Sequence, residues 1–126
     1  MNIPEDLRYS KEHEWARQEG EFVWVGISDY AQSELGDVVY IDLPAVGDHF
    51  KQNDIFGSIE AVKAASDLYC PVAGEIVEVN NDITDSPETI NKDPYNDGWM
   101  IKLKIDDLEE FNNLMDASEY LAHISD

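Results

Sequence analysis

The sequence predicts a mostly β protein built from two similar β units, with a short helix near residues 28–35 and helices at the C-terminus. Three observations lead to this prediction: β-branched and aromatic runs between residues 13 and 105, an internal repeat, and a helical pattern after residue 106. With 126 residues, 43% of them hydrophobic, the chain can form one modest core. We therefore expect a single domain over residues 1–126.

The N-terminal third predicts a hairpin, a short helix and a strand. The runs "EWARQ" and "EFVWVGI" flank Glu19 and Gly20, a pattern typical of a β-hairpin. Ser28 suits the N-cap of a short helix over "DYAQSEL", and Gly36 suits its C-terminal end. The run "DVVYIDL" then predicts a strand that ends before Pro44.

The internal repeat covers residues 44–55 and 71–83. "PAVGDHFKQNDI" aligns with "PVAGEIVEVNNDI", so that the prolines and glycines match and the Asn-Asp-Ile endings match after one inserted residue. Two copies suggest two β units that face each other. Lys63 lies at the midpoint of the segment that joins them, where one strand would turn back into the next.

A helix is the alternative for this joining segment. "SIEAVKAASDLY" is rich in helix-forming residues, and Ile59, Val62, Ser66 and Tyr69 fall near helical spacing. The turn also lacks the Asn-Gly or Asp-Gly pair of a tight hairpin. We prefer the hairpin because the repeat makes the two flanks equivalent strands.

The C-terminal part predicts a loop, a strand and helices. Residues 83–98 hold two prolines and many polar residues without periodicity, which predicts one long irregular loop. "WMIKLKI" alternates as a strand does, and Asp106 with Glu109 fits a helix-capping pattern. The helix that follows has one apolar stripe, formed by Leu108, Phe111, Leu114 and Met115. A final helical turn or two includes Tyr120, Leu121 and Ile124.

The charge of the chain restricts its partners. The 28 acidic residues against 8 Lys and Arg give a formal charge of −20, the wrong sign for binding nucleic acid or an anionic membrane. We expect partners with basic surfaces, although solubility alone also accounts for the charge. No apolar run exceeds the six residues of "FVWVGI", and the N-terminus lacks a signal-peptide pattern, so we expect a soluble protein that is not exported.

Cysteine and histidine give no sign of a metal site or disulfide. Cys70 is the only cysteine, which is consistent with a reducing compartment, and its strand-like surroundings predict a buried thiol. His13, His49 and His123 lie too far apart in sequence to show a ligand spacing, so we assign no metal.

Lys63 is the only cation between Gln52 and Asn91, among eight carboxylates. Nearby carboxylates favour the ammonium form, which is the opposite of what a Schiff-base lysine needs. The small residues Ala64 and Ala65 instead leave room for an enzyme that acylates the amine. Taken alone, a lysine at a turn is in most cases an ordinary solvated side chain.

The region "GSIEAVKAASDLYCPVAGEIVEVN" closely resembles the attachment region of the glycine cleavage system H protein family, which are lipoyl carriers. The blocks "KEHEWARQEGEFVWVGISDYAQSELGDVVYIDLPAVGD" and "YNDGWMIKLKIDDLEEFNNLMDASEYLAHI" are similar to the same family. The resemblance implies a lipoyl/biotinyl-type β-sandwich, or flattened barrel, with lipoate covalently attached to Lys63 at a hairpin tip. It also implies a carrier rather than an enzyme, with no catalytic residues of its own.

The resemblance further implies a set of partners in glycine catabolism and one-carbon metabolism. They are a pyridoxal-phosphate-dependent glycine decarboxylase that loads an aminomethyl group, a tetrahydrofolate-dependent aminomethyltransferase that takes it, a dihydrolipoyl dehydrogenase, and a lipoate-attaching enzyme. We expect a monomer in a bacterial cytoplasm. A mitochondrial matrix location would apply only to a mature form that has lost a transit peptide.

Family members shelter the loaded arm in a surface cleft, where the resemblance implies roles for Glu14 and Asp67. Carboxylates there would accept charge-assisted hydrogen bonds from the amine. The alternatives are that Glu14 is a solvated strand residue and that Asp67 caps its own turn. Glu12 and Glu34 stand where members carry Ser and His, which implies a more acidic cleft wall.

Other functions remain open. Biotin carriers resemble "AMKM" around the lysine, and lipoyl domains of 2-oxoacid dehydrogenases show "DKA" within long multidomain chains, and neither pattern is present here. A lipoate relay, which passes lipoyl groups to other enzymes, and an unmodified acidic binding domain with a free Lys63 amine are the remaining alternatives.

Overall fold

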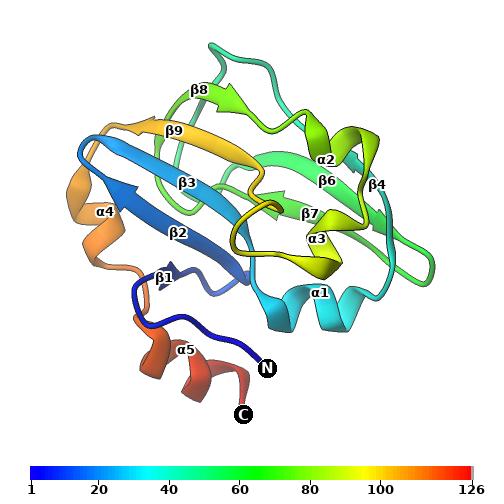
Figure 1. Ribbon diagram of the computed structural model, residues 1–126. Helices are drawn as coiled ribbons and strands as arrows, with labels where there is room; N and C mark the ends of the chain where they lie inside the picture. The colour runs from blue at the N-terminus through cyan, green and yellow to red at the C-terminus, as the bar shows by residue number, and fades with distance from the viewer. Residues whose placement is uncertain (126) are drawn as a thin grey trace.

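Two antiparallel sheets face each other and do not close into a barrel in the computed structural model, which describes residues 1–125 (Figure 1). The strands of the larger sheet, in spatial order, are β1 (Arg8–Tyr9), β2 (Glu14–Glu19), β3 (Phe22–Ile27), β9 (Ile101–Ile105), β8 (Gly74–Val79) and β5 (His49–Phe50). Those of the smaller sheet are β4 (Val38–Asp42), β6 (Ile55–Ala61) and β7 (Ala65–Tyr69). This is the predicted β-sandwich.

Short helices flank the sheets. They are α1 (Asp29–Leu35), α2 (Asp82–Asp85), α3 (Thr89–Lys92), α4 (Leu108–Asn112) and α5 (Ala117–Ile124). The prediction for α1 is confirmed: the Ser28 side chain accepts a hydrogen bond from the Ala31 amide, and Gly36 ends the helix with a φ of 82°. Helix α5 lies beside β1 and the N-terminal segment (Figure 1).

The main core lies between the sheets because each sheet turns its apolar side chains toward the other. Val25 of β3 and Leu103 of β9 come from the larger sheet, and Ile41, Ile59 and Leu68 come from the smaller one. All five are at most 2% exposed, so the alternating pattern of these strands has its ordinary cause in burial of one face. A second cluster, around Tyr9, Trp15 and Tyr120, packs α5 against β1 and β2.

The two copies of the internal repeat contact each other directly, as predicted. His49 and Phe50 of the first copy pair with Glu75 and Gly74 of the second, in antiparallel register. The matched glycines have different roles, since Gly47 has a φ of 98° whereas a Cβ on Gly74 would lie 2.5 Å from the Lys104 carbonyl oxygen. The repeat therefore predicted the pairing although the two turns differ in detail.

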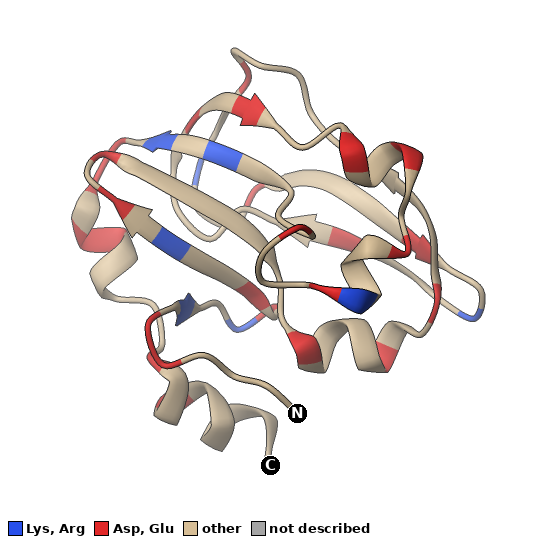
Figure 2. Cartoon of the chain, in the orientation of Figure 1, with Lys and Arg blue, Asp and Glu red and all other residues tan. Residues whose placement is uncertain are grey.

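The joining segment is a hairpin, which confirms that prediction and removes the helical alternative. Strands β6 and β7 pair from Ile55 opposite Tyr69 to Glu60 opposite Ala65. Residues 62–64 form the turn, and Figure 2 shows one basic residue at this tip. Acidic residues elsewhere are spread over helices, loops and strand ends in the same view.

The prediction of one irregular loop over residues 83–98 is wrong. Helices α2 and α3 begin in this segment or just before it, and each contributes one fully buried isoleucine, Ile83 and Ile90, to the main core. Each helix has only four residues, which is too short for a helical period to show against the surrounding prolines and aspartates. Burial of the two isoleucines stabilises these turns.

The predicted start of the C-terminal helices is wrong by one residue. Asp107, not Asp106, is the N-cap of α4, and its Oδ1 accepts from the Glu109 amide at 3.0 Å. Asp106 instead lies 2.6 Å from Nε2 of His49. Helix α4 ends at Asn112, so the predicted stripe is interrupted before Leu114. Leu108, the first residue of α4, is 45% exposed.

We predict that Gly57→Ala lowers the free energy of unfolding by about 3 kcal/mol, because overpacking beside a rigid backbone costs this much. A methyl group on Gly57 would collide with the carbonyl oxygen of Asp42 on the paired strand β4. Urea denaturation measures the change. Gly20→Asn is the matched control, because nothing lies within 4 Å of its Cβ position and Asn tolerates a φ of 62°. Equal midpoints for both variants would contradict the close approach.

Candidate functional site

Lys63 projects from the end of the β6–β7 hairpin. The turn is closed by a hydrogen bond of 2.7 Å from the Ala61 amide to the Ala64 carbonyl. Lys63 is exposed, as are Ala64 and Ala65, and Val62 is 76% exposed. The amine is therefore accessible to an enzyme from several directions.

The connector from α1 into β4, which is residues 36–38 and includes the first residue of β4, holds this tip. The Val62 amide donates to the Asp37 carbonyl oxygen at 3.0 Å. The aliphatic part of Lys63 lies over Gly36, where a Cβ would be only 2.9 Å from Cε of the lysine. The tip is thus fixed to a second element of the molecule and does not rely on the hairpin alone.

A cleft of about 220 Å³ opens beside the hairpin. It lies between the start of β2, helix α1 and strand β7. Its lining combines apolar and acidic side chains, and it consists of Glu12, His13, Glu14, Ile27, Tyr30, Ala31, Glu34, Leu35, Ile59, Ser66, Asp67 and Leu68. Strand geometry puts Asp67 on the order of 10 Å from Lys63 along β7, so a long group on the lysine can reach the cleft.

Glu14 is the buried carboxyl of this cleft, with only 1% of its surface exposed. The Ser10 hydroxyl donates to its Oε1 at 2.5 Å, and the Tyr69 amide donates to its Oε2 at 3.2 Å. Burial raises the pKa of Glu14 to about 8, although these two hydrogen bonds oppose the shift. Within residues 1–125 no cationic side chain forms a salt bridge with it.

The structure brings the two cleft residues expected from the sequence together. Asp67 lines the same cleft as Glu14 but is exposed, and it lies in the middle of β7 opposite Ser58. It is therefore a strand residue and not a turn cap. Glu12 and Glu34 also line the cleft, which agrees with the acidic cleft wall expected from the sequence.

Sequence reasoning missed His13 and Tyr30 in the cleft lining, and Tyr120, which contacts His13. His13 has a φ of 77°, and its Nδ1 lies 2.9 Å from the hydroxyl of Tyr120 on α5. That hydroxyl lies 2.7 Å from Oγ of Ser28, the N-cap of α1. Burial, followed by the nearby His123, lowers the pKa of His13. No sequence signal linked residues that are more than 100 positions apart.

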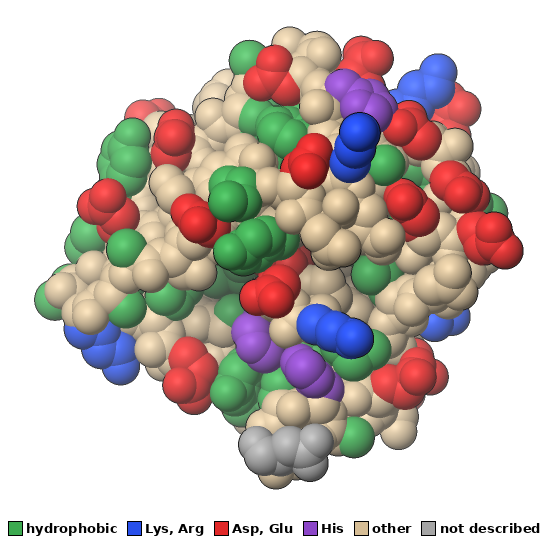
Figure 3. Space-filling model, turned by 180° about the vertical axis from the view of Figure 1, so that it is seen from behind, with side chains coloured by type: hydrophobic (Ala, Val, Ile, Leu, Met, Phe, Trp, Pro, Cys, Tyr) green, Lys and Arg blue, Asp and Glu red, His purple; other side chains and the backbone are tan. Residues whose placement is uncertain are grey.

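His13 and His123 are neighbours despite their separation in sequence. Their ring centroids are 5.8 Å apart, and Figure 3 shows two histidine side chains that meet beside a basic side chain on one face of the molecule. In the part of the chain that the structure describes, no three His, Cys, Asp or Glu side chains are grouped as metal ligands. Cys70 is buried, which raises the pKa of its thiol to about 12.

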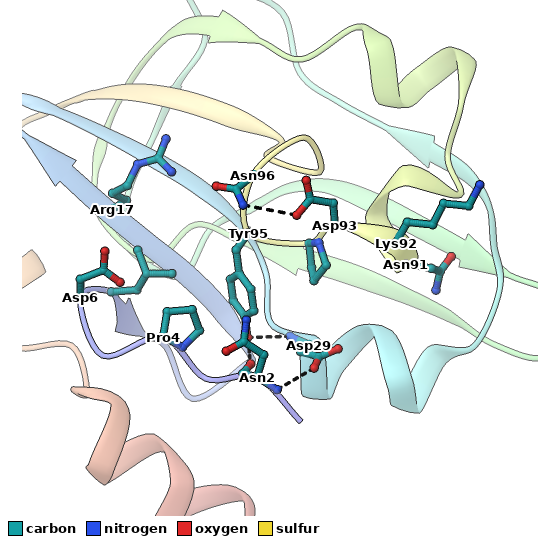
Figure 4. A pocket seen from close by; sticks show the side chains of 12 residues that line it. Asn2, Pro4, Asp6, Arg17, Asp29, Asn91, Lys92, Asp93, Tyr95 and Asn96 are labelled. Carbon is teal, nitrogen blue, oxygen red and sulfur yellow. Dashed lines mark hydrogen bonds between the residues drawn. The ribbon is translucent and has the colours of Figure 1, made fainter.

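A second concavity, of about 320 Å³, lies between the N-terminal segment and residues 91–96 (Figure 4). Three of its residues bond to one another: the Tyr95 hydroxyl accepts from the Asp29 amide at 2.8 Å and donates to the Asn2 carbonyl at 2.6 Å. The Asn2 amide donates to Asp29 at 2.8 Å. These bonds attach the N-terminal segment to α1. No helix of residues 1–125 is both long enough and apolar enough to cross a membrane.

A β-sandwich that presents one exposed lysine at a hairpin tip, beside a cleft, defines the class of carrier domains that hold a prosthetic group on a lysine. The sequence model of one family, described as Glycine cleavage H-protein, matches residues 7–126. The chain therefore belongs to the glycine cleavage H-protein family, whose members are lipoyl carriers of the glycine cleavage system and not catalysts.

Relatives over the full length agree with this assignment. The chain is 53% identical to the glycine cleavage system H protein of Geobacillus kaustophilus over 126 residues, which is 100% of this chain and 99% of the relative. It is 52% identical to that of Anaeromyxobacter sp. (strain K), over 100% of this chain and 98% of the relative. The crystal structure of a glycine cleavage system H protein from Mycobacterium marinum superposes with a TM-score of 0.90 at 37% identity, covering 98% of this chain and 99% of that one.

The buried carboxyl gives a pH prediction. Glu14 has a raised pKa in the folded state, so between pH 4.5 and about 8 the folded protein holds a proton that the unfolded chain releases. Its contribution to the free energy of unfolding is therefore complete below pH 4.5 and is lost as the pH rises toward 8, with a slope of about −1.4 kcal/mol per pH unit at most. Glu14→Gln removes this slope.

Urea denaturation between pH 5 and 8 measures the effect as a difference between Glu14→Gln and the unchanged protein. Glu12→Gln is the matched control, because Glu12 is exposed and lines the same cleft. Parallel pH profiles for Glu14→Gln and the unchanged protein would show that Glu14 is ionised in the folded state.

Proposed function

We propose that the chain, as one carrier domain over residues 1–126, holds lipoate in amide linkage on Nζ of Lys63 and shuttles an aminomethyl group within the glycine cleavage system. The observation that carries this proposal is the exposed Lys63 amine, which lies at the end of a hairpin fixed to a rigid β-sandwich. Membership of a family of lipoyl carriers supports the choice of the group.

The residues around Lys63 fit such a group. Ala64 and Ala65 are small and exposed, which leaves room for an attaching enzyme at the amine. The cleft offers an apolar floor, with Ile59 and Leu68 among its residues, for a hydrocarbon arm. Acylation would also remove the one positive charge of the tip.

Lipoate supplies a dithiolane that can accept a carbon group on sulfur and be reoxidised. Within the protein, Lys63 provides the point of attachment, and Glu14 and Asp67 provide acceptors for an ammonium group at the far end of the arm. Glu14 lacks a cationic partner among residues 1–125, so a docked ammonium group would supply the missing charge. No residue needs to act as a catalytic base.

We propose four partner enzymes: the glycine decarboxylase, the aminomethyltransferase, the dihydrolipoyl dehydrogenase and a lipoate-attaching enzyme. The net charge of −20 favours partner surfaces that are basic around the site where Lys63 enters. The named relatives are bacterial, which supports a cytoplasmic location, and we propose that the protein works as a monomer. Transient docking on each enzyme then moves the arm between sites at high local concentration.

Lys63→Arg tests the attachment. Protein purified from its native host should have an intact mass that is higher by one lipoyl group in amide linkage, and Lys63→Arg should lack the increment. Lys51→Arg is the control, because this exposed lysine lies outside the hairpin. Purified lipoylated protein should also stimulate glycine–bicarbonate exchange by the decarboxylase. An unmodified mass, or no stimulation by the modified protein, would contradict the proposal.

The roles of Glu14 and Asp67 can be tested with two chemically fixed arms. Alkylation of the reduced lipoyl thiols with 2-bromoethylamine gives a cationic arm, and alkylation with iodoacetamide gives a neutral arm of similar length. We expect the cationic arm to raise the free energy of unfolding by about 1.5 kcal/mol relative to the neutral arm, as a hydrogen bond to a charged group does. The difference should disappear in Glu14→Gln and shrink in Asp67→Asn. A difference that persists in Glu14→Gln would place the amine elsewhere.

A further inference from the structure

Asn91 of helix α3 connects with one side chain to three residues of the segment from α1 to β4. Its Oδ1 accepts from the Val38 amide at 2.9 Å. Its Nδ2 donates to the Gly36 carbonyl oxygen at 2.9 Å and to Oε1 of Gln32 at 3.0 Å. Every hydrogen-bonding position used here is filled by a donor or acceptor of the right kind, so the amide is well matched to this segment.

The residue before Asn91 explains why its position is fixed. Ile90 is fully buried in the main core, and it anchors the short helix α3 that carries Asn91. The position of Asn91 is therefore fixed by the packing of Ile90 in the core and by three hydrogen bonds of its own side chain. Such a residue transmits the rigidity of the sandwich to the segment that it contacts.

That segment is the connector that fixes the lysine tip. The carbonyl of Asp37, between the two residues that Asn91 holds on the backbone, accepts from the Val62 amide at 3.0 Å. Gly36, whose carbonyl Asn91 binds, lies directly under the aliphatic part of Lys63. Asn91 is therefore connected to the lysine tip in two steps. Its side chain binds the backbone on both sides of Asp37, and the Asp37 carbonyl binds the Val62 amide next to Lys63.

Core packing cannot replace this path. Residues 65–67 of β7 are all exposed, as are residues 62–64 of the turn, so Ile59, which pairs opposite Ser66, is the fully buried side chain nearest the tip. Beyond Ile59, the direction of the hairpin depends on the backbone pairing of β6 with β7 and with β4, which reaches Val38 opposite Ala61, and on the contact with Asp37. A loose connector would let the tip move over a wider range.

We propose that Asn91 is a positioning residue for the Lys63 carrier site, acting through residues 36–38. The proposal rests on the function proposed for Lys63, since positioning matters for enzymes that must bring this one amine to a reacting group. Asn91 contacts neither the arm nor the amine. Its effect is to restrict where the amine can be when a partner docks, which is the geometric condition for rapid reaction.

Asn91→Asp tests the proposal with minimal change of shape. The carboxylate keeps the acceptor for the Val38 amide but places an oxygen against two acceptors, the Gly36 carbonyl and Oε1 of Gln32. Asn96→Asp is the matched control, because it makes the same charge change on the same segment at an exposed site without contact to the connector. Asn91→Ser, which removes both donated bonds without adding charge, is the second variant.

Two measurements follow from the geometry. Steady-state kinetics with a lipoate-attaching enzyme and the apo-protein as substrate should show kcat/KM lower by about tenfold for both Asn91 variants, mainly through kcat, because the docking surface is unchanged and only the amine is misplaced. Hydrogen exchange of the Val62 amide should be about tenfold faster, because its bond to Asp37 opens more often. Asn96→Asp should match the unchanged protein in both.

A merely structural role is distinguished by two controls. A small succinimidyl ester should acylate Lys63 at equal rates in all variants, because the amine is exposed in each. Ile76→Val in β8 lowers the melting temperature through a change away from the tip. It should leave kcat/KM unchanged even where its loss of melting temperature equals that of Asn91→Asp. If Ile76→Val lowers kcat/KM as much as Asn91→Asp, or if Asn91→Asp leaves both readouts unchanged, the positioning role is overturned.

The failure of the proposed function would look different. If the unchanged protein is not lipoylated on Lys63 by intact mass, the carrier proposal fails. The exchange of the Val62 amide still tests whether Asn91 fixes the tip, because that readout needs no lipoate.

Discussion

The antiparallel pairing of β6 with β7 is the constraint on which the rest of the molecule depends. Ile59 and Leu68 are buried where the two strands leave the sandwich, whereas residues 65–67 are exposed. Side-chain packing therefore fixes the base of the hairpin, and backbone hydrogen bonds alone carry that order outward to the turn. This arrangement makes one amine both accessible and well placed. A helix over the same residues would have directed Lys63 to one side of a packed surface.

The cleft beside the hairpin combines two environments that suit the two parts of a long arm. Ile59 and Leu68 belong to an apolar surface, and Glu14 and Asp67 supply acidic groups nearby. An uncharged arm gains only the apolar contact, and an arm that ends in an ammonium group gains charge-assisted hydrogen bonds as well. In the function that we propose, the cleft would therefore hold a loaded arm more tightly than an unloaded one. That difference is useful to a carrier that must release its arm into several enzymes.

The sequence predicted the parts of the fold that repeat or alternate. The match of residues 44–55 with 71–83 decided for a hairpin around Lys63 although helix propensity favoured the alternative, because strand pairing across the repeat overrides local preference. Helices α2 and α3 were missed because four residues carry no period, and their stability comes from Ile83 and Ile90 in the core. Contacts such as His13 with Tyr120 were missed because only the folded chain brings them together.

The raised pKa of Glu14 sets this carboxyl apart from the many exposed carboxylates of the chain. Among residues 1–125 no cationic side chain forms a salt bridge with Glu14, and burial raises its pKa to about 8, which favours the protonated carboxyl near neutral pH. An arriving ammonium group reverses the balance, because the charged carboxylate then has a partner and can release its proton. The charge-assisted stabilisation of the proposed docked arm therefore appears only when the ammonium group is present. A cleft with a permanent lysine beside Glu14 would lack this response, since the carboxylate would already be paired.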